Sequence, residues 1–138
     1  MTRLNCQTTS VVLFVFTAVL SVVLVGGVFA QDLPSGGWTG SQTIGAGMEG
    51  YAVALPNGVY EVTGSGVALF MDNQEFHYLY KELSGDGTIT GRVVDNGTGS
   101  NTWAKGGGMI RDTLDPGSAH CTTVVTGGSG GGAPSRRS

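Results

Sequence analysis

Beyond residue 30, hydrophobic residues follow no long helical period and instead gather in short runs separated by glycine-containing turns. Runs of β-branched and aromatic residues with such turns are typical of a β-sandwich or barrel. The turns at Pro56, Asn57 and Gly58 and at Gly85 to Gly87 are each placed to close a hairpin between the flanking runs. The pattern predicts strands at residues 51–55, 59–63, 67–71, 75–83, 88–94, 103–111 and 120–126.

Alternation along the predicted strands assigns side chains to two faces, because successive residues of a strand point to opposite sides. In the run at residues 75–83, aromatic residues occupy every second position. One consistent arrangement buries this aromatic face together with the faces that carry Ile89 and Ile110. The other face of the sheet then shows a set of polar and basic side chains, namely His77, Arg92, Lys105 and Arg111.

The N-terminal segment has the layout of a secretory signal, with a basic residue, an apolar run and a small residue at its end. Arg3 precedes the apolar run at residues 11–30, which ends at Ala30. The pattern predicts a hydrophobic signal helix at residues 1–30, cleavage after Ala30, and a product that is secreted or resides in the cell envelope or periplasm. An uncleaved membrane anchor is the alternative, since the run approaches the ~20 residues that span a bilayer.

Cleavage would restrict both disulfide formation and membrane contact. Of the two cysteines, Cys6 precedes the apolar run and only Cys121 follows it. A cleaved chain therefore has no intramolecular disulfide, and Cys121 is predicted to be a small buried apolar residue. Contact with a membrane is expected only through the signal segment, before its removal.

The part of the chain that follows the signal segment is long enough for one small domain. The 138 residues carry a net charge of −3, which argues against nucleic-acid binding, because that requires a basic surface. Residues 31–126 are predicted to form the domain. Residues 127–138 are rich in glycine and serine and have no apolar face to bury, so a disordered tail is expected there.

Neither a catalytic pair nor a metal site stands out in the pattern. Retaining glycoside hydrolysis needs two carboxylates ~5 Å apart, and no strand carries acids at positions that would place such a pair on one face. Asp72, Glu75 and His77 could converge on a cation, as could Asp112 and Asp115, but neither group offers the six oxygens that calcium requires. We therefore expect no enzyme activity, no metal and no cofactor.

Residues 72–111 resemble the concanavalin A-like lectin/glucanase sandwich modules of secreted bacterial proteins, of the regulation-of-enolase type. The resemblance rests on the aromatic strand at 76–80, the Gly-Asp hairpin at 83–93, and the Trp103, Ala104, Lys105 strand that continues to Arg111. It implies an all-β, jelly-roll sandwich. Family members continue for many further strands, so the resemblance implies an incomplete sandwich whose uncovered sheet edges favour self-association.

The sequence and the resemblance together predict a non-catalytic, lectin-like module that binds a polysaccharide or cell-surface glycan. Sugars stack on aromatic rings and accept hydrogen bonds from basic side chains. A structural or vestigial fragment without independent activity is one alternative, and a glycosidase-related protein that lacks its catalytic pair is another. The predicted ligand-binding residues are His77, Arg92, Trp103, Lys105 and Arg111.

Overall fold

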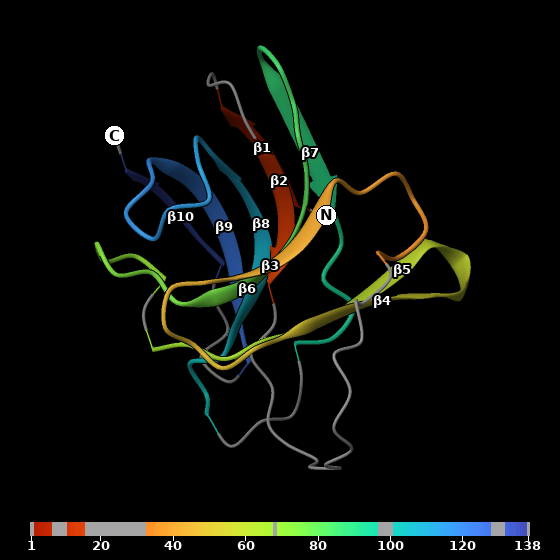
Figure 1. Ribbon diagram of the computed structural model, residues 1–138, viewed down its shortest axis with the longest axis horizontal. Helices are drawn as coiled ribbons and strands as arrows, with labels where there is room; N and C mark the ends of the chain where they lie inside the picture. The colour runs from red at the N-terminus through yellow and green to blue at the C-terminus, as the bar shows by residue number, and fades with distance from the viewer. Residues whose placement is uncertain are drawn as a thin grey trace.

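The computed structural model describes residues 2–6, 11–15, 33–67, 69–96, 101–127 and 132–137. Within these residues the regular elements are ten β-strands and one 3-10 turn, with no α-helix. The strands form one six-stranded sheet and two two-stranded sheets, and the described residues show no closed sandwich (Figure 1). The prediction of an all-β domain is confirmed.

The six-stranded sheet has the order β10-β9-β8-β2-β6-β3, and every neighbouring pair is antiparallel. Its strands are β2 (Val11–Val15), β3 (Gly40–Ile44), β6 (Phe76–Lys81), β8 (Lys105–Arg111), β9 (His120–Thr126) and β10 (Gly132–Arg137). β2 lies in the interior of the sheet, between two strands that come much later in the chain (Figure 1). The sheet therefore joins segments that are far apart in the sequence.

The hairpin of β4 (Tyr51–Leu55) and β5 (Val59–Thr63) confirms the strands and the turn predicted there. The two strands are connected by the 3-10 turn η1 (Pro56–Gly58). Asn57 and Gly58 have φ angles of 64° and 71°, in the left-handed region that Asn-Gly turns tolerate. The hairpin lies apart from the six-stranded sheet except near its base, where it covers β6 (Figure 1).

The hairpin predicted around Gly85 to Gly87 is wrong. β7 (Gly87–Gly91) pairs with β1 (Thr2–Cys6), whereas the two neighbours of β6 are β2 and β3. A turn sequence reverses the direction of the chain but does not determine which strands pair. Both edges of β6 are already paired, with β2 on one side and β3 on the other. The strand predicted at residues 67–71 is also not formed; the described residues there are bends.

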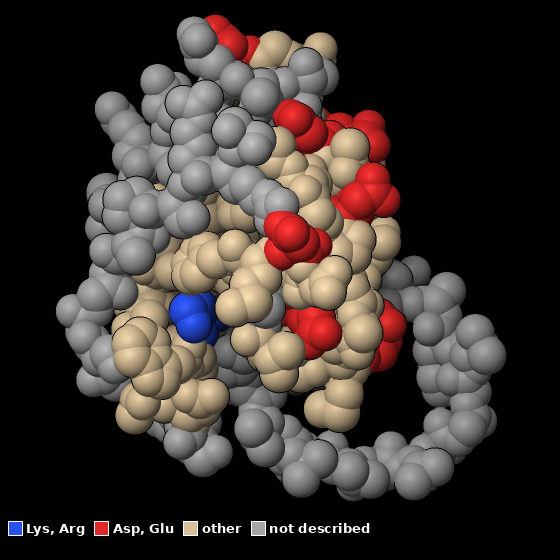
Figure 2. Space-filling model, turned by 90° about the vertical axis from the view of Figure 1, so that its left-hand side faces the viewer, with Lys and Arg blue, Asp and Glu red and all other residues tan. Residues whose placement is uncertain are grey.

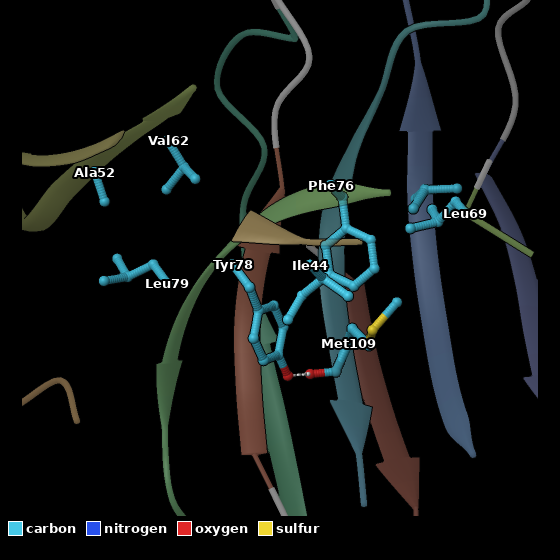
Figure 3. Packing of buried hydrophobic residues seen from close by; sticks show 9 residues of the cluster. Ile44, Ala52, Val62, Leu69, Phe76, Tyr78, Leu79 and Met109 are labelled. Atoms are coloured by element: carbon cyan, nitrogen blue, oxygen red, sulfur yellow. Dashed lines mark hydrogen bonds between the residues drawn. The ribbon is translucent and has the colours of Figure 1, made fainter. Parts of the chain in front are cut away.

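Both faces of β6 are buried, and the hydrophobic core lies on both sides of this strand. On one side, Phe76 and Tyr78 pack among residues from other strands, including Ile44 and Met109. On the other side, Leu79 points toward the β4–β5 hairpin (Figure 3). The buried cluster comprises Ile44, Ala52, Val62, Leu69, Phe76, Tyr78, Leu79, Met109 and Val124.

The predicted face of β8 is wrong. The guanidinium of Arg111 lies over the rings of Phe76 and Tyr78, so the face of β8 that carries Arg111, rather than the face of Ile110, meets the aromatic residues. Alternation divides each strand into two faces, but it does not say which face of one strand joins which face of another. Ile110 is also buried, because both faces of β8 are covered.

Both ends of the chain also differ from the prediction. Residues 2–6 and 11–15, expected in a signal helix, form β1 and β2, while residues 16–30 of that segment lie outside the described residues. Residues 132–137, expected in a disordered tail, form β10 against β9. Backbone pairing with a neighbouring strand satisfies hydrogen bonds regardless of side chain, so a segment with no apolar face can still form an edge strand.

Cys121 is not a free thiol. Its side chain is nearly buried, as predicted, but it is disulfide-bonded. The sequence contains two cysteines, Cys6 and Cys121. The expectation of an unpaired Cys121 applies to a chain without residues 1–30, and the disulfide of the full chain does not test it.

Candidate functional site

Two of the predicted binding residues lie together where the chain enters β8. Trp103 is 62% exposed, although indole side chains are usually well covered. The ammonium of Lys105 lies 5.8 Å from the centroid of the indole ring and donates a hydrogen bond of 3.0 Å to the Trp103 carbonyl. The pair forms an exposed aromatic surface beside a positive charge.

The turn that presents Trp103 is anchored by hydrogen bonds of its backbone groups, two of which involve the side chains of Asn96 and Asn101. The backbone N–H of Trp103 donates to Asn101 Oδ1 at 2.9 Å, and the N–H of Ala104 donates to the Asn101 carbonyl at 3.0 Å. The Ala104 carbonyl accepts hydrogen bonds from Asn96 Nδ2 and from the Gly127 N–H. Trp103 is therefore held outward by a tethered turn.

His77 is buried, not exposed as predicted. It is 1% exposed because the β4–β5 hairpin covers this side of β6. Gly50 and Gly64 lie directly against His77, and a Cβ atom at either position would collide with it. Alternation within one sheet does not predict a second layer such as the β4–β5 hairpin. The sequence pattern therefore places His77, a polar residue on the face opposite the aromatic residues, in contact with solvent.

The imidazole of His77 is held by two hydroxyl groups of β3. Nε2 lies 2.7 Å from Ser41 Oγ, and Nδ1 lies 2.9 Å from Thr43 Oγ1. Thr43 Oγ1 donates to Glu49 Oε1 at 3.3 Å and accepts from the Gly50 N–H at 3.1 Å. With the Thr43 proton directed to Glu49, Nδ1 of His77 is the donor to Thr43 and Nε2 accepts from Ser41.

The hydrogen bonds that join His77 to Ser41 and Thr43 depend on a neutral imidazole. Burial lowers the pKa of His77, while the negative charge of Glu49 opposes that shift. The sequence pattern missed Ser41 and Thr43, because no strand was predicted at residues 40–44. The signal that could have found them is the Ser-x-Thr spacing, which places both hydroxyls on one face of a strand.

Arg111 is also buried, and its contacts are internal. It is fully covered, with its guanidinium carbon 5.1 Å from the Phe76 ring centroid and 5.7 Å from that of Tyr78. Nε donates to the Thr113 carbonyl at 2.6 Å, and a terminal nitrogen donates to the Asp115 carbonyl. The prediction that Arg111 lies on an exposed binding face is therefore wrong.

The electrostatic setting of Arg111 follows from this enclosure. Burial lowers the pKa of its guanidinium, and the neighbouring Tyr78 and Asp115 oppose the shift. Burial likewise raises the pKa of the Tyr78 hydroxyl, against the effect of Arg111. Both groups keep their ordinary protonation states near neutral pH, so Arg111 is a buried cation enclosed by aromatic rings and backbone carbonyls.

Among the exposed charged side chains of the described residues, carboxylates outnumber Lys and Arg. Figure 2 shows carboxylate side chains spread over one face, where Lys and Arg cover only a small area. Arg92, the fifth predicted residue, is exposed just after β7. In the part of the chain that the structure describes, no group of three or more His, Cys, Asp or Glu side chains is placed to hold a metal ion. Within the same residues, no helix has the length and apolar character needed to cross a membrane.

Comparison of the chain with protein-family models, with curated proteins and with solved structures found no match. The described residues define the class of the protein as an antiparallel, all-β domain. A function for this domain must therefore be argued from the geometry of its own residues.

Proposed function

We propose that this protein is a secreted, non-catalytic, lectin-like module that binds carbohydrate, with a fold of the concanavalin A-like jelly-roll type. The observation that carries the proposal is the exposed indole of Trp103 beside the ammonium of Lys105. The apolar faces of sugar rings pack on aromatic planes, and sugar hydroxyls accept hydrogen bonds from nearby cations.

The contrast with the other tryptophan supports a surface role for Trp103. Trp38 is half-buried and packs edge-on against Tyr60, with ring centroids 5.2 Å apart. Trp103 instead exposes most of its ring on a tethered turn, and tryptophan is among the residues enriched at binding interfaces and their hot spots. Within the proposal, Trp103 and Lys105 contact the ligand, exposed Arg92 is a further hydrogen-bond donor, and buried His77 and Arg111 support the scaffold.

Polysaccharide retention tests the proposal. The full chain is screened on a glycan array, and its retention on the polysaccharides that bind is measured by pull-down. Trp103→Ala should weaken binding by about tenfold or more, which corresponds to about 1.4 kcal/mol. Phe70→Ala is the matched control, because Phe70 is a 40% exposed aromatic on a different loop and its loss should leave retention unchanged.

Two outcomes would contradict the proposal. One is a screen in which no polysaccharide is retained. The other is a bound polysaccharide whose affinity is the same for Trp103→Ala, Lys105→Ala and the parent chain. Tryptophan fluorescence provides a second readout, because ligand contact should shift the emission of exposed Trp103 and leave that of half-buried Trp38 in place.

Export is the second part of the proposal and predicts a mature N-terminus at Gln31. Intact-mass analysis of extracellular or periplasmic product should show the loss of residues 1–30. Because Cys121 is disulfide-bonded in the full chain, the mass is measured before and after reduction, which distinguishes a released segment from a tethered one. A membrane-retained product of full length would support the anchor instead.

A further inference from the structure

β2 lies between two strands, β6 and β8, and pairs with both of them. Its five residues pair antiparallel with residues 107–111 of β8, and residues 12–14 also pair antiparallel with residues 79–81 of β6. β2 therefore separates β6 from β8, and each of these strands directs one edge of its backbone toward it.

The surroundings of this place determine which side chains it accepts. Of the residues that pair with β2, Leu79 on β6 and all but Gly108 on β8 are buried, whereas Tyr80 is half-buried and Lys81, at the end of β6, is exposed. Both faces are therefore covered over most of the place that β2 occupies. A strand between two such neighbours must be apolar on both faces, as in sheets that are covered on both sides. β2 meets this requirement with the continuous apolar sequence Val-Val-Leu-Phe-Val.

The proposed export would remove this strand. Residues 11–15 belong to the segment that is lost on cleavage after Ala30. The facing edges of β6 and β8 would then lack a partner for their backbone N–H and C=O groups, which are costly to leave unsatisfied in a buried position. An open edge of this kind is a template for a strand from another chain.

We propose that the place between β6 and β8 is a strand-acceptor site, which in the exported protein binds an extended apolar segment donated by a different polypeptide. The inference rests on the proposed export. The donor strand runs antiparallel to both neighbours, has at least five uncharged residues and is apolar on both faces. Main-chain hydrogen bonds provide affinity, and burial of alternate side chains on the two faces provides selectivity.

The test begins from the folded full chain. A protease site is placed in the segment between residues 15 and 33, in a Cys121→Ser background so that no disulfide retains the cut segment. After cleavage, we expect the N-terminal segment to co-purify in a 1:1 ratio and to exchange for a labelled, lysine-flanked peptide of residues 11–15. At a peptide concentration 100-fold above Kd, binding should raise Tm by about 10 °C relative to the protein from which the cut segment has been removed.

The position and chemistry of binding are tested with matched variants. A peptide with Leu13→Pro lacks a backbone donor and should not exchange. A peptide with Val12→Cys should form a disulfide with Lys81→Cys, its register partner, and not with Lys105→Cys, which lies outside the residues that pair with β2.

Three results would overturn the inference. The first is loss of the cut segment with Tm unchanged and no peptide bound, which would mean that β6 and β8 close on each other. The second is binding of the proline peptide as tight as that of the parent peptide. The third is formation of oligomers by the processed protein that exclude the peptide, which would make a second copy the donor. Each result is independent of polysaccharide retention and of the intact mass of the exported product, so failure of the acceptor site is distinguishable from failure of the proposed function.

Discussion

Lys105 and Arg111 begin and end the same strand, and both place a cation over an aromatic ring, yet their environments are opposite. The Lys105 ammonium lies beside an exposed indole. The Arg111 guanidinium lies over two buried rings and donates to the carbonyls of Thr113 and Asp115. The first arrangement is open to a ligand, whereas the second is part of the core.

The comparison shows that position within a strand does not determine the role of a cation. Lys105 and Arg111 lie six residues apart on β8 and therefore point to the same face. The difference comes from what covers each end of the strand. The loop that contains Thr113 and Asp115 folds back over Arg111, while the turn before Lys105 projects Trp103 outward.

Removal of Arg111 should have the largest effect on stability. Arg111→Ala leaves two carbonyls without their donor, removes both cation–π contacts and creates a cavity, so we expect a loss of about 3 kcal/mol in the free energy of unfolding. Urea denaturation monitored by circular dichroism measures it. Arg92→Ala, at an exposed position, is the control and should change stability by less than about 0.5 kcal/mol. Equal effects of the two substitutions would remove the distinction between buried and exposed cations.

Gly107, which lies between the two cations on β8, should be the next most sensitive position. A Cβ atom there would collide with the carbonyl oxygen of Thr123 on β9, so Gly107→Ala must push the two strands apart. We expect a loss of about 2 kcal/mol, within the range for overpacked sites, measured by the same urea titration. An unchanged free energy of unfolding in Gly107→Ala would show that β8 and β9 separate easily. The close pairing of Gly107 with Val124 argues against that outcome.

Acidification should destabilise the domain through His77. Burial lowers the pKa of folded His77 below its ordinary value of 6.5, so the unfolded chain takes up a proton first as the pH falls. The contribution of neutral His77 is therefore complete above pH 6.5 and is lost as the pH falls from there toward the lowered folded pKa. Thermal melts at pH 7 and pH 5 should show a lower Tm at pH 5, and His77→Gln should reduce the difference. An unchanged pH dependence in His77→Gln would contradict the assignment.

Lys105→Ala should have the smallest effect on stability. The ammonium lies beside an exposed ring and a backbone carbonyl at the surface, where such contacts contribute about 0.5–1 kcal/mol or less. Differential scanning calorimetry should show a shift in Tm of no more than a few degrees. A loss as large as that of Arg111→Ala would mean that Lys105 is a structural residue and would weaken its assignment to a binding surface.

The sequence was informative about single strands and less so about their partners. The β4–β5 hairpin was predictable, because Asn57 and Gly58 have a local preference for positive φ. The pairings of β2 with β6 and β8 were not, because hydrogen bonds between distant strands leave no local pattern. The burial of His77 and Arg111 was not predictable for the same reason, because the hairpin that covers His77 and the rings of Phe76 and Tyr78 that lie against Arg111 come from other parts of the chain. Trp103 and Lys105 lie in contact within one turn, and their role in ligand binding stays a prediction.

The position of β2 also has a consequence for the timing of folding. Residues 11–15 are synthesised well before their partners on β8, which extend to residue 111. The interior of the six-stranded sheet therefore cannot close until residue 111 has left the ribosome. Contacts with such long sequence separation make folding slow. During synthesis, the apolar segment is therefore exposed before its partner strand exists, and the proposed export would compete with folding for the same residues.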